Sequence, residues 1–230
     1  MLEPLIAAAG GMVFQSAPTL QRIAELAAEY NVLLLFDEVF TGMGRTGAMF
    51  AMQYADVKPD MVALAKGLTG GALPLAVTLA SEKIHAAFVS EDAAKTFYHG
   101  HTMSGNPPGC AAALASFALF DTEKRLPQVQ QLQTRMEEGW RHLVQRFPDK
   151  LRDVRALGGV SAANLVSHRE EPGYVFSATR RIREIGLEHG VILRPLGDVI
   201  YVTPPYNISD SALDRVFQAI AAAVTDYRVE

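Results

Sequence analysis

The sequence has a single cysteine, Cys110, so no disulfide can form within the chain and a reducing compartment is expected. No group of cysteines and histidines has the spacing of a zinc site, and we expect no bound metal. No apolar run approaches the roughly 18 residues that a membrane span needs. The opening residues lack the basic region of a secretion signal, because Glu3 stands where positive charge belongs. These absences predict a cytoplasmic protein without a membrane partner.

Positive charge is also scarce. The net charge of −4 provides no basic surface for nucleic acid, which excludes nucleic-acid binding as the expected function. What is present is an ordinary globular composition, with 49% hydrophobic and 20% charged residues in a chain of 230. That length suits one large domain or two small ones.

The first part of the chain alternates a helix with apolar strands. Residues 18–30, "PTLQRIAELAAEY", have apolar positions at helical spacing, with Pro18 near the first turn. Residues 32–39 ("VLLLFDEV"), 61–65 ("MVALA") and 74–81 ("PLAVTLAS") are continuously apolar, as in strands buried on both faces of a parallel sheet. This alternation predicts an α/β fold.

The second part has a different pattern. Residues 106–120 predict a buried alanine-rich helix with Cys110 as a small packing residue. The pattern then predicts an amphipathic helix, a strand, another helix, a β-hairpin that turns at Gly197-Asp198, and a terminal helix, at residues 126–147, 158–166, 177–190, 191–204 and 209–227. Gly190 is expected to end its helix and Ser209 to cap the last one. We therefore expect an α/β domain at 1–122 and a small α+β domain at 123–230.

Gly42, Gly44 and Gly47 follow the first strand with the spacing of a dinucleotide-binding turn. The context disfavours that function, because the strand ends in Asp37-Glu38 and two carboxylates would repel a diphosphate. The next strand ends in Lys66 rather than in an acidic residue.

An acid at one strand end and a lysine at the next indicate another chemistry. The ends of neighbouring parallel strands converge on the ligand crevice of an α/β sheet. Pyridoxal phosphate suits such a pair, since its aldehyde condenses with a lysine amine and its pyridine nitrogen needs an anionic partner. Asp37 would be that partner and Lys66 the amine. From the spacing alone, a structural ion pair between the two residues is an equally good interpretation.

The chain resembles the class III (subgroup II) pyridoxal-phosphate aminotransferases of fold type I. The matching stretches are "EPLIAAAGGM", "LLLFDEVFTGMGRTGAMFA", "VKPDMVALAKGLTGGALPLA" and "HGHTMSGNPPGCAAALA". The resemblance implies that Asp37 holds the pyridinium, that Val39 on the same strand face packs against the ring, and that Lys66 is the cofactor lysine. It also implies that Thr102 binds the cofactor phosphate of a neighbouring subunit, although Thr102 could instead cap the following helix. His99 and His101 are interpreted as residues that hold the loop around Thr102.

The stretch "LRPLGDVIYVTPPY" resembles the biotin-pathway branch of this family. Members of that branch convert 8-amino-7-oxononanoate to 7,8-diaminononanoate, with S-adenosylmethionine as the expected amino donor. By this resemblance Arg194 binds the substrate carboxylate and Tyr201 shapes the pocket, whereas the alternative for Arg194 is a surface salt bridge. The rival functions are an ω-amino acid or ornithine aminotransferase, and a non-catalytic fragment.

The resemblance starts inside the large domain of the family, so the N-terminal half of that pattern is absent. The absent half carries the glycine-serine turn for the cofactor phosphate and the aromatic residue that stacks on the ring. We therefore expect a homodimer or a complementing N-terminal half as partner. A sheet with absent strands should leave edges unpaired and apolar faces uncovered.

Overall fold

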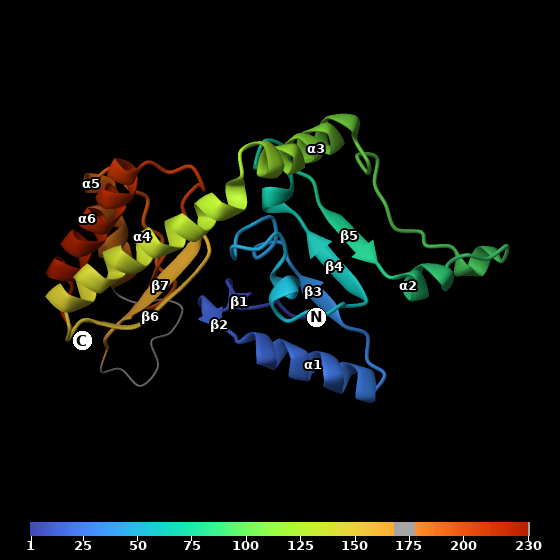
Figure 1. Ribbon diagram of the computed structural model, residues 1–230, viewed down its shortest axis with the longest axis horizontal. Coiled ribbons are helices and arrows are strands. Elements are labelled where there is room, and N and C mark those ends of the chain that lie inside the picture. The colour runs from blue at the N-terminus through green and yellow to red at the C-terminus, as the bar shows by residue number, and fades with distance from the viewer. Residues whose placement is uncertain (168–177, 230) are drawn as a thin grey trace. The chain divides into compact units, whose positions relative to one another are not determined.

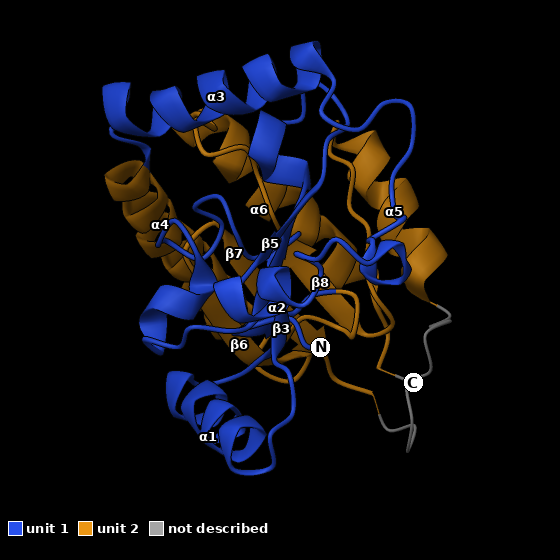
Figure 2. Cartoon of the chain, turned by 90° about the vertical axis from the view of Figure 1, so that its right-hand side faces the viewer, with its two compact units in different colours: residues 1–8, 14–125 blue, residues 9–13, 126–230 orange. Residues whose placement is uncertain are grey.

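The computed structural model describes residues 1–167 and 178–229. The chain divides into two compact units, which Figure 2 colours separately. Unit 1 comprises Met1–Ala8 and Phe14–Arg125, and unit 2 comprises Ala9–Val13 and Leu126–Glu230. The expected functional domains, 1–122 and 123–230, stay a prediction.

Unit 1 is built around a three-stranded sheet of order β3-β4-β5 (Figure 1). Its helices and strands are β1 (Ile6–Ala7), α1 (Ala17–Glu29), β3 (Leu35–Asp37), η1 (Ala51–Tyr54), β4 (Met61–Leu64), η2 (Lys66–Thr69), β5 (Val77–Ala80), α2 (Glu82–Ala86), η3 (Ala93–Lys95) and α3 (Pro107–Thr122). A further short strand, β2 (Val13–Phe14), pairs with β1 and lies where the two units meet in sequence.

The sheet of unit 1 is mixed rather than parallel. β3 and β4 pair in parallel, with Asp37 opposite Ala63. β4 and β5 pair antiparallel, so the expectation of a wholly parallel sheet is wrong for β5. The connection from β4 to β5 contains only the 3₁₀ turn η2 and lacks the crossover helix that usually returns a chain to a parallel strand.

The strand predicted at residues 32–39 is shorter than expected. The apolar run at 32–39 forms a strand only over β3, and the side chains of Val32 and Leu33 are 60% and 47% exposed. Leu79 on β5 is 50% exposed as well. These values confirm the expected exposure of apolar residues beside the sheet.

Helix α3 is buried on one face only. Asn106 caps it, because its side chain accepts a hydrogen bond from the Gly109 amide. Its buried face contacts η2, whereas Leu114 is 72% exposed and Cys110 is exposed too. The expectations of a fully buried helix and of a packing role for Cys110 are therefore wrong, because an all-round apolar composition does not show which face finds a partner.

The described residues of unit 2 form a three-stranded antiparallel sheet of order β6-β7-β8 and three helices, and Figure 1 labels the helices, β6 and β7. The elements are α4 (Arg125–Arg146), β6 (Leu151–Leu157), β7 (Val160–Leu165), α5 (Ala178–Glu188), β8 (Val199–Val202) and α6 (Asp210–Asp226). The predicted helices, strand and Ser209 cap are confirmed, and Gly190 follows α5 with a positive φ of 70°. Ser177, the first residue of one predicted helix, lies outside the described residues. No helix within residues 1–167 and 178–229 has the length and apolarity to cross a bilayer.

The core of unit 2 centres on the apolar face of α4. Trp140 is fully buried there, and its ring meets Phe217 of α6 edge-on at a centroid distance of 5.6 Å. The indole nitrogen of Trp140 donates to the hydroxyl of Ser161 on β7, 2.8 Å away. The buried α4 residues recur at steps of three and four, as predicted: Val129, Leu132, Met136, Trp140 and Leu143.

The predicted hairpin before β8 is only half formed. Leu196 and Val199 exchange two backbone hydrogen bonds of 2.9 Å, and Gly197 has a φ of 57°, which confirms the turn at Gly197-Asp198. The incoming arm is not a strand, because Pro195 has no amide hydrogen to offer a ladder. Asp198 is buried and accepts a hydrogen bond from the Asn164 side chain on β7.

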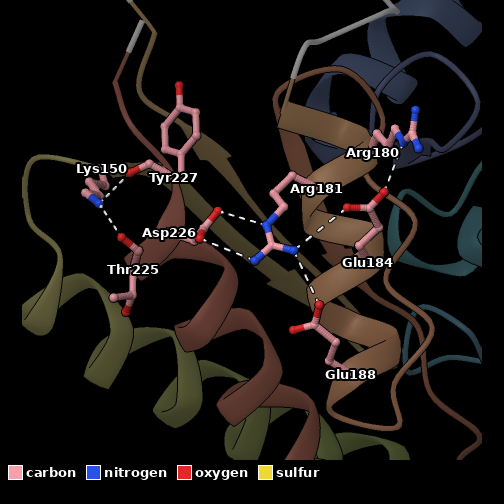
Figure 3. A network of polar contacts seen from close by, with 8 residues as sticks. All are labelled: Lys150, Arg180, Arg181, Glu184, Glu188, Thr225, Asp226 and Tyr227. Carbon is pink, nitrogen blue, oxygen red and sulfur yellow. Dashed lines mark hydrogen bonds and ion pairs between the residues drawn. The ribbon is translucent and has the colours of Figure 1, made fainter.

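A network of polar contacts surrounds the C-terminal end of α6 (Figure 3). The Lys150 ammonium donates to the carbonyl oxygens of Val224, Thr225 and Tyr227. On the neighbouring helix Arg181 contacts Asp226, and it also pairs with glutamates of its own helix. The last turn of α6 is thereby held to the start of β6.

Candidate active site

Asp37 and Lys66 lie at the same edge of the unit 1 sheet. Asp37 is the last residue of β3 and sits opposite Ala63 of β4. Lys66 follows the end of β4 and begins η2. Because β3 and β4 run in parallel, Asp37 lies at the carboxyl end of one strand and Lys66 just beyond the carboxyl end of its neighbour, where α/β proteins bind ligands.

Asp37 and Lys66 do not bind each other. Among the ion pairs of residues 1–167 and 178–229, none joins the two, so the structural ion-pair interpretation is wrong. One carboxylate oxygen of Asp37 accepts from the Val39 amide at 3.1 Å. The Lys66 nitrogen lies 5.5 Å from the centre of the Phe40 ring. A carboxylate and an exposed amine therefore remain for a ligand at this edge.

Val39 lies in a turn, which corrects the expectation that it shares the strand face of Asp37. β3 ends at Asp37, and the hydrogen bond from the Val39 amide to the Asp37 carboxylate bends the chain at once. Aspartate side chains commonly bond the backbone two residues on, and this local bond ends the extended conformation.

The backbone at Lys66 is in the left-handed region, with a φ of 44°. Non-glycine residues adopt this conformation at a cost and mostly where the surroundings enforce it, and such positions gather at functional sites. Gly67 follows, and a β-carbon there would approach the β-carbon of Met43 to 2.9 Å. The chain can therefore pass close to the glycine turn only because residue 67 has no side chain.

A cleft of about 850 Å³ opens beside Lys66. Its wall combines residues 65–66 and 71–76 with residues of the segment that precedes α3, among them His101, Ser104 and Asn106. Asp37, Val39 and Thr102 are not part of this wall. Sequence reasoning missed Ser104 and Asn106, although the asparagine before two prolines is itself a helix-start signal.

Thr102 is exposed and lies in the segment between α2 and α3, which in Figure 1 extends beyond α2 and then returns to α3. Asn106 rather than Thr102 caps α3, so the capping alternative for Thr102 is wrong. The ring nitrogen Nδ1 of His101 accepts from the Met103 amide at 3.1 Å, which confirms its interpretation as a loop-holding residue. The His99 ring packs against Phe97.

The glycine turn after β3 is tight and leads into no α-helix. Gly44 and Gly47 have φ values of 82° and 96°, and the Gly44 amide donates to the Met49 carbonyl. The short 3₁₀ turn η1 follows. The helix N-terminus on which a dinucleotide turn places its pyrophosphate is thus missing at this position.

Glu38 is a site feature that sequence reasoning left without a role. Its side chain is 1% exposed, and burial raises the pKa of its carboxyl, while hydrogen bonds from Met52, Ala51 and Thr41 oppose that rise. The sequence shows only that Glu38 is acidic and next to Asp37. Its burial follows from contacts with residues further along the chain.

Arg194 and Tyr201 belong to unit 2, on either side of the turn at Gly197. Arg194 is exposed, and none of the ion pairs among the described residues involves it, so the surface salt-bridge alternative is wrong. Tyr201 is half-buried on β8, opposite Ala162 of β7. The guanidinium of Arg194 is therefore not engaged by a carboxylate of the described residues.

Comparison with protein families matches residues 1–224 to the aminotransferase class-III family. The chain belongs to the class-III aminotransferases. The adenosylmethionine-8-amino-7-oxononanoate aminotransferase of Synechococcus elongatus is 42% identical over 221 residues, which cover 96% of this chain and 51% of that protein. The protein of the same name from Geobacter sulfurreducens is 39% identical, over 97% of this chain and 50% of the relative. This class-III chain thus spans about half the length of the curated relatives it matches.

Solved structures agree with this class-III membership. The chain matches adenosylmethionine-8-amino-7-oxononanoate aminotransferase from Methanocaldococcus jannaschii with a TM-score of 0.90 and 34% identity, over 99% of this chain and 54% of that one. An amine transaminase from an uncultivated Pseudomonas species, solved in its PLP-bound form, gives 0.87 and 30%, over 97% and 51%. The predicted fold class, part of a fold-type I transferase with mixed α/β structure, is confirmed.

Proposed function

We propose that this chain carries the cofactor lysine of a pyridoxal-phosphate-dependent aminotransferase that acts on 8-amino-7-oxononanoate. The observation that carries the proposal is the placement of Asp37 and Lys66 at the carboxyl ends of adjacent parallel strands, without an ion pair between them. A carboxylate and a primary amine are the donor set that this cofactor requires, so the residues present fit it.

When bound, pyridoxal phosphate supplies an aldehyde and a protonated pyridine ring that accepts electrons. Lys66 would hold the aldehyde through its amine and, once released, would move a proton at the substrate carbon. Asp37 would hold the proton on the ring nitrogen by a charge-assisted hydrogen bond. From its place in the turn after β3, Val39 would pack against the ring, and the hydroxyl of Thr102 would bind the phosphate in a neighbouring subunit of a homodimer. The exposure of Thr102 supports this last assignment, since a residue that serves another subunit must reach outward.

The substrate assignment is supported by the names of the curated relatives and by Arg194. Eight curated relatives at 34–42% identity are named adenosylmethionine-8-amino-7-oxononanoate aminotransferase. We assign the carboxylate of the oxo acid to Arg194, whose planar guanidinium suits bidentate binding, and the wall of the pocket to Tyr201. S-Adenosylmethionine is the proposed amino donor, and the proposed setting is biotin synthesis in the cytoplasm.

A second candidate is transamination of ω-amino acids. An ω-aminotransferase from Paracoccus denitrificans matches the chain with a TM-score of 0.86 at 27% identity, over 97% of this chain and 50% of that one. The likeness of fold alone does not separate the two substrate classes, because the same scaffold supports different side-chain pockets.

Chemical trapping tests the cofactor assignment. The chain is incubated with pyridoxal phosphate, reduced with borohydride, digested and analysed by mass spectrometry. We expect the cofactor mass on the peptide that contains Lys66, its loss in Lys66→Ala, and no change in Lys58→Ala, which removes another exposed lysine of unit 1. Equal labelling of Lys58 and Lys66, or an unchanged total amount of attached cofactor in Lys66→Ala, contradicts the proposal.

A substrate comparison tests the reaction. The chain is assayed alone and with the N-terminal half of a biotin-pathway relative supplied in trans, with 8-amino-7-oxononanoate or an ω-amino acid as substrate. Arg194→Lys should raise KM for the oxo acid, and Arg141→Lys on exposed α4 surface should not. Turnover of the ω-amino acid alone favours the second candidate, and failure to bind cofactor even with the added half favours a non-catalytic fragment.

A further inference from the structure

Glu38 is a buried carboxylate without a cation. Its side chain is 1% exposed, and none of the ion pairs among the described residues includes it. Three donors occupy its oxygens instead. Oε2 accepts from the Ala51 amide at 2.7 Å and from the Thr41 hydroxyl at 3.2 Å, and Oε1 accepts from the Met52 amide at 2.9 Å. An acid kept inside with no counter-ion is costly, so its hydrogen-bond partners must stabilise it.

These hydrogen bonds close a loop. Glu38 precedes residues 39–50, and the two amides that it binds directly follow them. Within the loop, the Gly42 amide donates to the backbone oxygen of Glu38 at 2.9 Å. A β-carbon on Gly42 would lie 2.8 Å from that same oxygen, so only glycine permits this close approach. The side chain of Glu38 therefore fastens both ends of the glycine turn.

The fastened loop meets Lys66 at two points. The Phe40 ring lies over its ammonium, with 5.5 Å between the nitrogen and the ring centre. The Met43 side chain packs against Gly67, the next residue after Lys66. Lys66 itself holds the left-handed φ of 44°, a conformation that must be maintained by its neighbours.

We propose that Glu38 is a positioning residue for Lys66: by fastening the loop at 39–50, it holds the Phe40 ring over the lysine amine and Met43 against Gly67. The importance of this arrangement for the reaction rests on the proposed function, which makes Lys66 the cofactor lysine. The mechanical coupling between Glu38 and Lys66 does not rest on it. The Phe40 ring covers one side of the amine, so the loop restricts the approach of a reagent from that side.

Substitution of Glu38 by glutamine tests whether its hydrogen bonds fasten the loop at 39–50. The amide oxygen can take the place of Oε2 and keep two donors, Ala51 and Thr41, which leaves an NH₂ group facing the Met52 amide. We expect hydrogen exchange at Met52 to accelerate roughly tenfold while Ala51 stays protected. Glu38→Met, which fills the space without any acceptor, should expose both amides. Glu25→Gln on the exposed face of α1 is the matched control and should change neither.

The coupling to Lys66 is measured with an amine-reactive ester and mass spectrometry, well below the unfolding temperature. In Glu38→Gln the labelling of Lys66 relative to Lys58 should rise on the order of two- to fivefold, because the Phe40 ring is released. In a Phe40→Leu background, Glu38→Gln should leave this ratio unchanged, since the contact that transmits the effect is gone. A purely structural role for Glu38 would give the same rise in both backgrounds.

Three results overturn the inference: a Met52 amide that stays protected in Glu38→Gln, an unchanged Lys66 to Lys58 ratio when the Met52 amide does exchange, or the same rise of that ratio in the Phe40→Leu background. Neither measurement uses cofactor. Failure of the borohydride trapping at Lys66 would overturn the proposed function and leave the positioning role of Glu38 intact, so the two failures are distinguishable.

Discussion

The hydroxyl of Ser116 on α3 donates a hydrogen bond to the carbonyl oxygen of Gly67, 3.2 Å away. Ser116 is 8% exposed and lies far along the chain from the turn that it binds. Gly67 directly follows Lys66 in the turn η2. Helix α3 therefore holds this turn through Ser116, and the Met43 side chain packs against Gly67 as well. The strained backbone of Lys66 is thus supported by contacts from two separate segments of unit 1.

Loss of the Ser116 hydroxyl should loosen this turn. We expect Ser116→Ala to lower the free energy of unfolding by about 1 kcal/mol, because the carbonyl oxygen of Gly67 loses the hydroxyl donor and keeps only the Gly70 amide. Urea unfolding followed by circular dichroism measures it. Thr122→Ala, which removes an exposed hydroxyl bonded to Ala118 in the same helix, should change stability by less than about 0.5 kcal/mol. Equal effects of the two substitutions would contradict the supporting role of Ser116.

The bond between Trp140 and Ser161 should be an energetic link between α4 and β7. Trp140→Phe leaves a cavity and removes the donor to a fully buried hydroxyl, so we expect a loss of about 2–3 kcal/mol. A double-mutant cycle with Ser161→Ala should give a coupling of about 1 kcal/mol. Circular dichroism follows unfolding in each variant, since Trp140 is the only tryptophan. Additive effects would show that the hydrogen bond contributes no stability of its own.

Lys150 should stabilise the end of α6 through the three carbonyl oxygens that its ammonium binds, of which Figure 3 draws those of Thr225 and Tyr227. Lys150→Met keeps the aliphatic stem and removes the donors, and we expect a loss of about 1–3 kcal/mol. Hydrogen exchange should accelerate in the last turn of α6. Arg181→Met removes the exposed ion pair between Arg181 and Asp226 in the same network. It should lower the free energy of unfolding by less than Lys150→Met does. A larger effect of Arg181→Met would refute this ranking.

Glu38 should make stability depend on pH. Burial raises its pKa in the folded protein above the ordinary value of 4.5, so the folded state keeps the proton at pH values where the unfolded state has lost it. The contribution of Glu38 to the free energy of unfolding should therefore be greatest below pH 4.5, fall as pH rises through the raised pKa, and then stay constant. Glu38→Gln lacks the titrating group. The wild-type minus variant difference should decline with rising pH, and a difference that grows would show a lowered pKa instead.

Features with a local cause could be predicted from the sequence. The face of α4 that carries Trp140 follows from apolar residues three and four positions apart, and the start of α6 follows from the Ser209 side chain, which accepts from the Ala212 amide. The order Asp37, glycine turn and Lys66 likewise indicated the cofactor chemistry before any fold was known. In the two helices the relevant groups are close in sequence, and for Asp37 and Lys66 the signal is the residue type at the end of each apolar run.

Features with a distant cause required the tertiary structure. The antiparallel course of β5, the single buried face of α3 and the exposure of Cys110 depend on which segments find partners, and sequence spacing does not contain that choice. The sequence by itself determined which residues are the candidates for the chemistry, because a lysine amine and an aspartate carboxylate have fixed reactivities. Only the tertiary structure decided how they are held. Glu38, Met43 and Ser116 act on the turn at Lys66 and Gly67 through contacts between residues far apart in the sequence, which form only when the chain folds.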